Sequence, residues 1–200
     1  MPYPLRPDVP GATYHVNSQG TNKETIFLDD HDRESFLVHL DRAAARQGWM
    51  VLAHCLMTTH YHLVLTVPRG GLSEGMRLLN RGYSFRTNQR HGRTMHLFRQ
   101  RFFSVGVDTD SHLLEACRYV VLNPVRARMC ERPEEWRWSS YRATAGLSAS
   151  LSFLALDEVL GRFGDDRRRA QAVYRRFVQD GLDQVSDTDG ELARDDPFRA

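Results

Sequence analysis

The spacing of hydrophobic residues along the chain predicts strands and helices in a regular order. Apolar residues alternate with polar ones, or run together briefly, in four segments that predict strands: residues 12–17, 49–56, 60–67 and 102–107. Apolar residues recur at helical spacing in two longer segments, which predicts helices from the Asp29–Asp32 cap to about Gln47 and from Leu72 to about Arg90. A third helix is expected to begin at His112.

The resulting order of elements, β-α-β-β-α-β-α, is typical of one fold class. It matches the split βαβ pattern of the ferredoxin-like fold. We therefore expect an α+β protein with a βαββαβ antiparallel sheet, helices on one face and a C-terminal helical extension. The main domain is expected over residues 1–130, the helical extension packed on it over residues 131–182, and an acidic, disordered tail over residues 183–200.

Length and composition exclude several classes of protein. A chain of 200 residues with 41% hydrophobic and 26% charged residues can bury a core and is not a disordered tail. No apolar run approaches the roughly 20 residues that span a bilayer, and the N-terminal residues lack the apolar stretch of a secretory signal. The three cysteines, Cys55, Cys117 and Cys130, lack the spacing of a zinc site or a disulfide framework. We expect a protein of the reducing cytoplasm, without a membrane partner.

Positive charge is concentrated in the middle of the chain, although the net charge is only +2. Residues 69–107 contain eight arginines and a single acid, Glu74, for a net charge of +7. Such a stretch indicates either a surface for nucleic acid or a solvated helix face, and charge alone does not decide between them. Seven of these arginines are candidate DNA contacts: Arg77, Arg81, Arg86, Arg90, Arg93, Arg99 and Arg101. Arg90 and Arg93 flank the loop after the second helix and are the first choice for phosphate contacts.

Two histidines are placed to bind one metal ion. His60 and His62 are two residues apart on a predicted strand, so their side chains share a face about 7 Å apart. Two adjacent imidazoles can chelate a divalent cation, although a structural pair would give the same pattern. His54, on the neighbouring strand, could approach His60 as a further ligand, whereas His15 is expected to be structural or to face a phosphate.

Tyr119 is a candidate nucleophile on the third predicted helix. A tyrosine can attack when its hydroxyl is deprotonated or lies beside a metal that polarises the target. Asn123 follows at i+4 on nearly the same face, but Pro124 should end or kink the helix there. A helical tyrosine by itself is more often a packing residue. Tyr141 is a weaker candidate, because its segment has no metal partner nearby in sequence.

Six short motifs occur in one order at plausible spacings. They are Tyr14–Asn17, Ile26–Arg33, Cys55–Leu63, Arg99–Phe102, Arg118–Ala127 and Trp138–Tyr141. Together they resemble the REP-associated tyrosine transposases, relatives of the insertion-sequence transposases that use one catalytic tyrosine, within the His-hydrophobic-His single-strand nuclease superfamily. The resemblance covers about residues 5–145. The chain departs from the family pattern at Thr58–Thr59, where Pro-Asn is usual, and at Tyr61, which fills the hydrophobic position.

The resemblance implies a fold, a site and a reaction. It implies the same ferredoxin-like fold, with Tyr119 as the nucleophile and His60 and His62 as the metal-binding pair. Asn123 stands where a polar third ligand is expected. The cofactor would be Mg²⁺ or Mn²⁺. The partner would be single-stranded or hairpin DNA at repetitive extragenic palindromes, cleaved and rejoined through a 5′-phosphotyrosine intermediate by a monomer or homodimer.

Two other functions are compatible with the same residues. A domesticated descendant would bind the DNA hairpin without strand transfer, but such a binder has no physical need for His60, His62 and Tyr119 together. A metal-dependent RNA nuclease would use water in place of Tyr119 and would form no covalent adduct. The formation of a protein–DNA adduct therefore discriminates the transposase from both alternatives.

Overall fold

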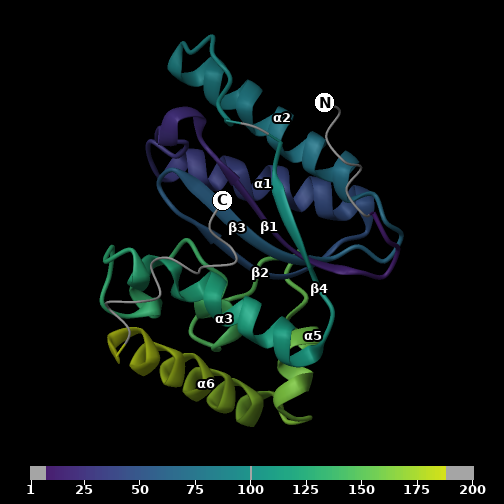
Figure 1. Cartoon of the computed structure of the whole chain (residues 1–200), viewed down its shortest axis with the longest axis vertical. Helices are drawn as coiled ribbons and strands as arrows, with labels where there is room; N and C mark the ends of the chain where they lie inside the picture. The colour runs from purple at the N-terminus through teal and green to yellow at the C-terminus, as the bar shows by residue number, and fades with distance from the viewer. Residues whose placement is uncertain (1–7, 100, 188–200) are drawn as a thin grey trace.

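Four antiparallel strands form one sheet in the order β2-β3-β1-β4 (Figure 1). The computed structural model describes residues 8–99 and 101–187. Within it the strands are β1 (Thr13–Gln19), β2 (Met50–Leu56), β3 (His60–Thr66) and β4 (Phe103–Val107). Each lies within two residues of the range that the hydrophobic pattern predicts, and the order of elements confirms the α+β, ferredoxin-like fold class.

Three long helices alternate with the strands: α1 (Asp30–Gln47), α2 (Leu72–His91) and α3 (Asp110–Arg126). The side chain of Asp29 caps α1 by accepting a hydrogen bond from the backbone N–H of Asp32 (3.0 Å). Gly48 ends this helix with a left-handed φ of 68°, a conformation that costs glycine little. Gly75 lets α2 approach the ring of Trp49 closely, since a Cβ there would lie 2.1 Å from a ring atom.

The candidate nucleophile lies in the second half of α3. This helix continues through Pro124 to Arg126, three residues beyond the end expected at Asn123. Tyr119 and Asn123 are therefore one helical turn apart, and the amide nitrogen of Asn123 donates a hydrogen bond to the backbone carbonyl of Tyr119 (2.9 Å). The i+4 relation that Pro124 put in question is present in the structure.

The sheet separates two helical layers. Figure 1 shows α1 and α2 on one face, as predicted, and α3 on the other, together with the C-terminal helices. Adjacent residues of β3 point to these two layers in turn. The ring of Tyr61 lies 4.6 Å from that of Phe36 on α1, and its hydroxyl donates to Asn80 on α2 (2.5 Å). The ring of the next residue, His62, instead contacts Tyr119 on α3.

The C-terminal part of the chain packs against α3 and the edge strand β2. It contains α4 (Tyr141–Thr144), α5 (Leu156–Leu160) and α6 (Arg167–Asp187). The backbone N–H of Leu56 donates to the carbonyl of Trp138 (2.9 Å), and Arg118 donates to the carbonyl of Phe177 (3.3 Å). α6 extends into the region expected to be an acidic tail, whose residues 188–200 lie outside the described residues. In the part of the chain that the structure describes, no helix is long and apolar enough to cross a membrane.

Candidate active site

Four aromatic side chains meet between the sheet and α3. The ring centroids of His60 and His62 are 5.0 Å apart, and that of Tyr119 lies 5.8 Å from His62. The ring of His15, on β1, stacks on His62 at 5.2 Å and lies 5.7 Å from Tyr119. The two candidate metal ligands and the candidate nucleophile, which are 57 to 59 residues apart in sequence, thus occupy one site.

Strand register explains why His15 joins the site. β1 and β3 are antiparallel, with Asn17 directly opposite His62. Paired residues share a face of the sheet, and so do residues two apart on a strand, which places His15 diagonally beside His62. His15 could not be assigned to the site from the sequence, because no local pattern shows which strands pair or in what register. Its only sequence signal was a histidine at an inward position of the first strand.

Each candidate metal ligand makes a hydrogen bond through one ring nitrogen. Nδ1 of His62 lies 3.0 Å from Nε2 of His15, and Nδ1 of His60 lies 3.1 Å from the hydroxyl oxygen of Thr59. His15 and His62 are buried, whereas His60 is half-buried. Thr59 is one of the three residues that depart from the family pattern, and here its side chain contacts the site directly.

Burial keeps both candidate ligands uncharged at neutral pH. It lowers the pKa of His60 to about 4. Burial, together with repulsion from the rings of His15 and His60, lowers the pKa of His62 well below its usual value of 6.5. A neutral imidazole is the form that binds a metal ion. The electrostatics of the site therefore favour metal binding over a charged histidine pair.

The donor set fits a divalent ion that retains open coordination positions. Among the described residues no group of three or more His, Cys, Asp and Glu side chains could hold a metal. Two imidazoles leave positions for phosphate oxygens and water, as a catalytic ion requires. Asn123, expected as a third ligand, is buried and uses its amide nitrogen within α3. It makes no hydrogen bond to His60 or His62 within the described residues.

Two alternative site residues lie elsewhere. His54 is opposite Leu63 on the sheet, and residues paired across strands share a face, so it lies on the face away from His62. Its ring contacts Phe153 at 5.7 Å, and burial lowers its pKa to about 4. Tyr141 is buried with its ring 6.0 Å from that of Tyr174. Tyr119 is therefore the tyrosine that the fold brings to the histidine pair.

A cation also lies over the candidate nucleophile. The guanidinium carbon of Arg126 is 4.8 Å from the centroid of the Tyr119 ring. The two residues are seven apart, which is two turns of α3, so helical spacing could have indicated the contact. Arg126 lies outside the basic stretch of residues 69–107, so the concentration of charge did not point to it.

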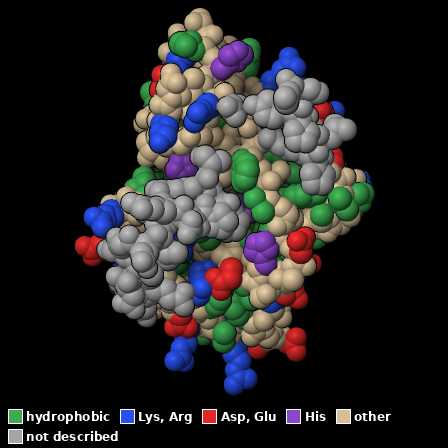
Figure 2. Space-filling model, in the orientation of Figure 1, with side chains coloured by type: hydrophobic (Ala, Val, Ile, Leu, Met, Phe, Trp, Pro, Cys, Tyr) green, Lys and Arg blue, Asp and Glu red, His purple; other side chains and the backbone are tan. Residues whose placement is uncertain are grey.

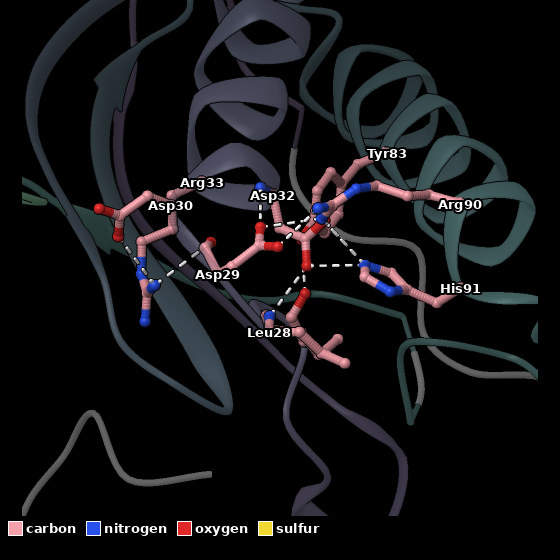
Figure 3. Close-up of polar contacts among 9 residues, drawn as sticks. Leu28, Asp29, Asp30, Asp32, Arg33, Tyr83, Arg90 and His91 are labelled. Carbon is pink, nitrogen blue, oxygen red and sulfur yellow. Dashed lines mark hydrogen bonds and ion pairs between the residues drawn. The ribbon is translucent and has the colours of Figure 1, made fainter.

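Arg90, one of the first choices for a phosphate contact, is held in an internal ion-pair cluster (Figure 3). Its guanidinium group pairs with Asp29 (2.5 Å) and with the buried Asp32 (2.6 Å). Hydrogen bonds from Arg90 and from the Asp32 backbone hold the pKa of Asp29 far below its usual range. Burial alone would raise the pKa of Asp32, but hydrogen bonds from His91, the Leu28 backbone and Arg90 outweigh it and lower that pKa. The cluster joins the C-terminus of α2 to the N-terminus of α1.

The other arginines of the basic stretch fall into two groups. Arg77 pairs with Glu74 (2.7 Å) and Arg93 with Glu24 (3.2 Å). The remaining candidates are exposed and form no ion pair within residues 8–99 and 101–187: Arg81, Arg86, Arg99 and Arg101. In the view of Figure 2, the Lys and Arg side chains are dispersed and form no continuous patch. The stretch is thus partly structural, which the charge count did not reveal.

The chain is similar to known transposases both in sequence and in fold. Residues 8–123 match the model of the family described as IS200-like transposases. The fold is similar to that of a REP-associated tyrosine transposase bound to a REP hairpin, with a TM-score of 0.64 and 15% identity over 76% of this chain and 96% of that chain. A proposed transposase from Deinococcus radiodurans is similar with a TM-score of 0.42 and 16% identity over 67% of this chain and 97% of that one. No curated protein matches the sequence.

Proposed function

The chain belongs to the IS200-like transposase family, and from this premise we propose that it cleaves and rejoins single-stranded or hairpin DNA through a 5′-phosphotyrosine at Tyr119. The resemblance to single-tyrosine insertion-sequence transposases, expected from the ordered motifs, is confirmed at the level of this family. The observation that carries the proposal is the meeting of Tyr119 with His60 and His62 on one face of the sheet.

The reaction is an exchange of phosphoester bonds. The hydroxyl oxygen of Tyr119 attacks the phosphorus in line, the P–O3′ bond breaks, and the tyrosine proton ends on the released 3′-hydroxyl. The reverse attack by a DNA 3′-hydroxyl on the phosphotyrosine rejoins the strand, so bond energy is conserved. The resemblance described above implies a metal-dependent reaction, in which an Mg²⁺ or Mn²⁺ ion held by His60 and His62 would polarise a phosphate oxygen.

Arg126 adds positive charge at the same place. Its guanidinium lies over the Tyr119 ring, where a phosphate attached to the tyrosine would be within reach of a planar, bidentate donor. We assign it the role of holding the phosphate oxygens as negative charge develops on them. This role complements His60 and His62, because it needs no metal.

The loop after α2 offers a path for DNA to the site. The backbone N–H of Arg99 donates to the carbonyl of Gln19 (2.9 Å), and Gln19 lies opposite His60 on β3. Two strand spacings therefore separate the backbones of Arg99 and His60, a distance of about 10 Å. We propose that Arg99 and Arg101 grip the strand nearest the site, and that Arg81 and Arg86 contact a more distant part of the DNA.

A hairpin substrate is supported by the structural relative, which was solved with a REP hairpin. Hairpins present unpaired bases beside a duplex stem, and a single strand can bend into a site that a continuous duplex could not enter. REP sequences are accordingly the first substrates to test. The alternative of a DNA-hairpin-binding protein without strand transfer predicts affinity for the same hairpin but no covalent product.

Covalent capture tests the proposal. The protein is incubated with an end-labelled REP hairpin and Mn²⁺, and the products are separated on a denaturing gel. Wild-type protein should give a slowly migrating protein–DNA band, and Tyr119→Phe should give none while binding the hairpin with unchanged affinity. Tyr141→Phe, which alters a buried tyrosine outside the site, is the matched control and should retain the band. An adduct with Tyr119→Phe would show that the nucleophile is another residue.

A further inference from the structure

The two candidate metal ligands share one feature that the reaction itself does not require. Each uses Nδ1 in a hydrogen bond inside the protein: His62 with Nε2 of His15 (3.0 Å) and His60 with the hydroxyl oxygen of Thr59 (3.1 Å). In both rings the second nitrogen, Nε2, takes no part in these bonds. Nε2 is therefore the ring nitrogen that remains available for a metal ion on both histidines.

The position of one proton decides whether that nitrogen can bind a metal ion. A neutral imidazole carries a proton on one nitrogen and a lone pair on the other. If His62 carried its proton on Nε2, its Nδ1 would accept a hydrogen bond from His15 and the remaining nitrogen could not bind a cation. If it carries the proton on Nδ1, it donates to His15 and Nε2 is free. The same choice applies to His60 and Thr59.

Resting on the proposed function, we infer that His15 and Thr59 are positioning residues, each of which accepts the Nδ1–H of one metal-binding histidine and leaves its Nε2 lone pair free for a divalent cation. Partners of this kind orient metal-binding histidines and fix their tautomers. At His62 the partner is another histidine, whose ring lies nearly parallel to it at an interplanar angle of 21°.

Burial makes this selection effective. His15 is only 1% exposed and His62 only 4% exposed, so water has little access to replace the hydrogen bond between them. Their stacked rings also restrict rotation of His62 about its side-chain bonds. In a buried pair, the loss of one partner leaves a polar nitrogen without a hydrogen bond, which is costly. Burial therefore keeps Nδ1 of His62 engaged in its hydrogen bond with His15.

The turn that carries Thr59 is held in place by backbone bonds outside the site. The carbonyl of Thr59 accepts a hydrogen bond from the N–H of Gly20 (2.8 Å), and the carbonyl of Thr58 accepts one from the N–H of Ile26 (3.0 Å). The backbone that carries the hydroxyl group is thus held beside His60. Thr59 departs from the Asn of the resembled family, yet its hydroxyl group can still accept a hydrogen bond.

Two pairs of variants separate the acceptor from the bulk of the side chain. His15→Phe retains a flat ring against His62 but offers no acceptor, whereas His15→Gln restores one. Thr59→Val has nearly the same shape but no hydroxyl, whereas Thr59→Ser retains it. His54→Phe is the matched control, because it replaces another buried strand histidine on the opposite face of the sheet.

The first measurement is the nitrogen-15 chemical shift of the histidine rings in the metal-free, full-length protein, which identifies the protonated nitrogen. His60 and His62 should both carry the proton on Nδ1. In His15→Phe, His62 should become a mixture of tautomers, and in Thr59→Val, His60 should do so. The second measurement is calorimetric titration with Mn²⁺, whose affinity should fall about tenfold in each of these variants. Thr59→Ser, His15→Gln and His54→Phe should remain within about twofold of wild type.

Protonation of Nε2 in wild-type His62 would overturn the inference, as would an unchanged Mn²⁺ affinity in both His15→Phe and Thr59→Val. Should His15→Phe fail to fold, the Thr59→Val and Thr59→Ser pair still decides the outcome at His60. Failure of the proposed function is distinguishable, because the tautomers are measured without DNA. Expected tautomers with no covalent adduct would refute the function alone, and an adduct with unaffected tautomers would refute the positioning roles alone.

Discussion

Two clusters of aromatic rings lie on opposite faces of the same sheet. On the α1–α2 face, Phe36 contacts Tyr61 and Tyr83 at ring distances of 4.6 and 5.2 Å, and all three are fully buried. On the α3 face, His62 and Tyr119 are similarly close, with ring centroids 5.8 Å apart. Rings contact one another on both faces, so ring contact by itself does not distinguish the core from the site.

The difference lies in where the polar atoms of the rings are directed. On the α1–α2 face, the hydroxyl of Tyr61 donates to Asn80 and that of Tyr83 donates to the carbonyl of Ile26, both at 2.5 Å. These partners are internal, so the polar atoms stabilise the fold. On the α3 face, His60 and His62 use only Nδ1 in these hydrogen bonds, so their Nε2 atoms remain available for a metal ion. An aromatic cluster becomes a candidate site when its polar atoms are not all used inside the protein.

The largest effect is expected from a change in the aromatic cluster on the α1–α2 face. Phe36→Ala should lower the free energy of unfolding by about 3–5 kcal/mol, because it leaves a cavity among fully buried rings. The measurement is chemical denaturation followed by intrinsic fluorescence. Under conditions where the variant is folded, its rate of adduct formation should match that of wild type. A selective loss of chemistry would mean that the two faces are coupled.

The next largest effect is expected at the histidine pair on the α3 face. His60→Ala should reduce adduct formation about 100-fold, because a single remaining imidazole holds the ion poorly. The free energy of unfolding should change by only about 1 kcal/mol, since His60 is half-buried. Hairpin affinity should be largely retained. Cleavage that continues undiminished in saturating EDTA would contradict a role for the metal.

A smaller effect is expected at the cluster that joins α1 and α2. Arg90→Met should lower the melting temperature by about 5 °C, because Asp32 is buried and loses an ionic partner. Arg86→Met, at an exposed position of the same helix, is the matched control and should leave the melting temperature unchanged. Equal melting temperatures in the two variants would show that the ion pair contributes nothing to stability.

The same cluster predicts a dependence of stability on pH. The folded-state pKa values of Asp29 and Asp32 lie below their ordinary value of 3.8. Their contribution is therefore fully present above this ordinary, unfolded-state value and is lost as the pH falls toward the lower folded-state values. Wild-type protein should lose stability below about pH 4, measured by denaturation at a series of pH values. Arg90→Met should lose less over the same range.

The smallest expected effect concerns DNA binding. If the four exposed arginines each contact a phosphate, log K should fall against log salt with a slope of about −2.8 for single-stranded DNA. Changing Arg81 and Arg86 to Ala should flatten the slope by about 1.4, as measured by titrating one hairpin at several salt concentrations. Changing Arg90 and Arg93 to Ala should have little effect on it, because both are paired. The opposite result would show that DNA displaces the internal ion pairs.

Local patterns in the sequence determined the order of elements and the core of the candidate site. Strand alternation placed His60 and His62 on one face, and helical spacing placed Asn123 one turn from Tyr119. These relations depend only on the geometry of a single strand or helix. They do not depend on how the rest of the chain folds, which is why they could be predicted. The helix that carries both residues also continues through Pro124, which follows Asn123 directly.

The tertiary structure alone decided the relations between distant segments. The register of β1 on β3 brought His15 to His62 across 47 residues, and the packing of α1 on α2 joined Arg90 to Asp29 across 61 residues. The physical reason is that pairing between segments depends on packing of the whole chain. Local hydrophobic periodicity carries no information about that packing. For the same reason, the sequence showed how many arginines the basic stretch contains, but only the folded chain showed which of them are already neutralised.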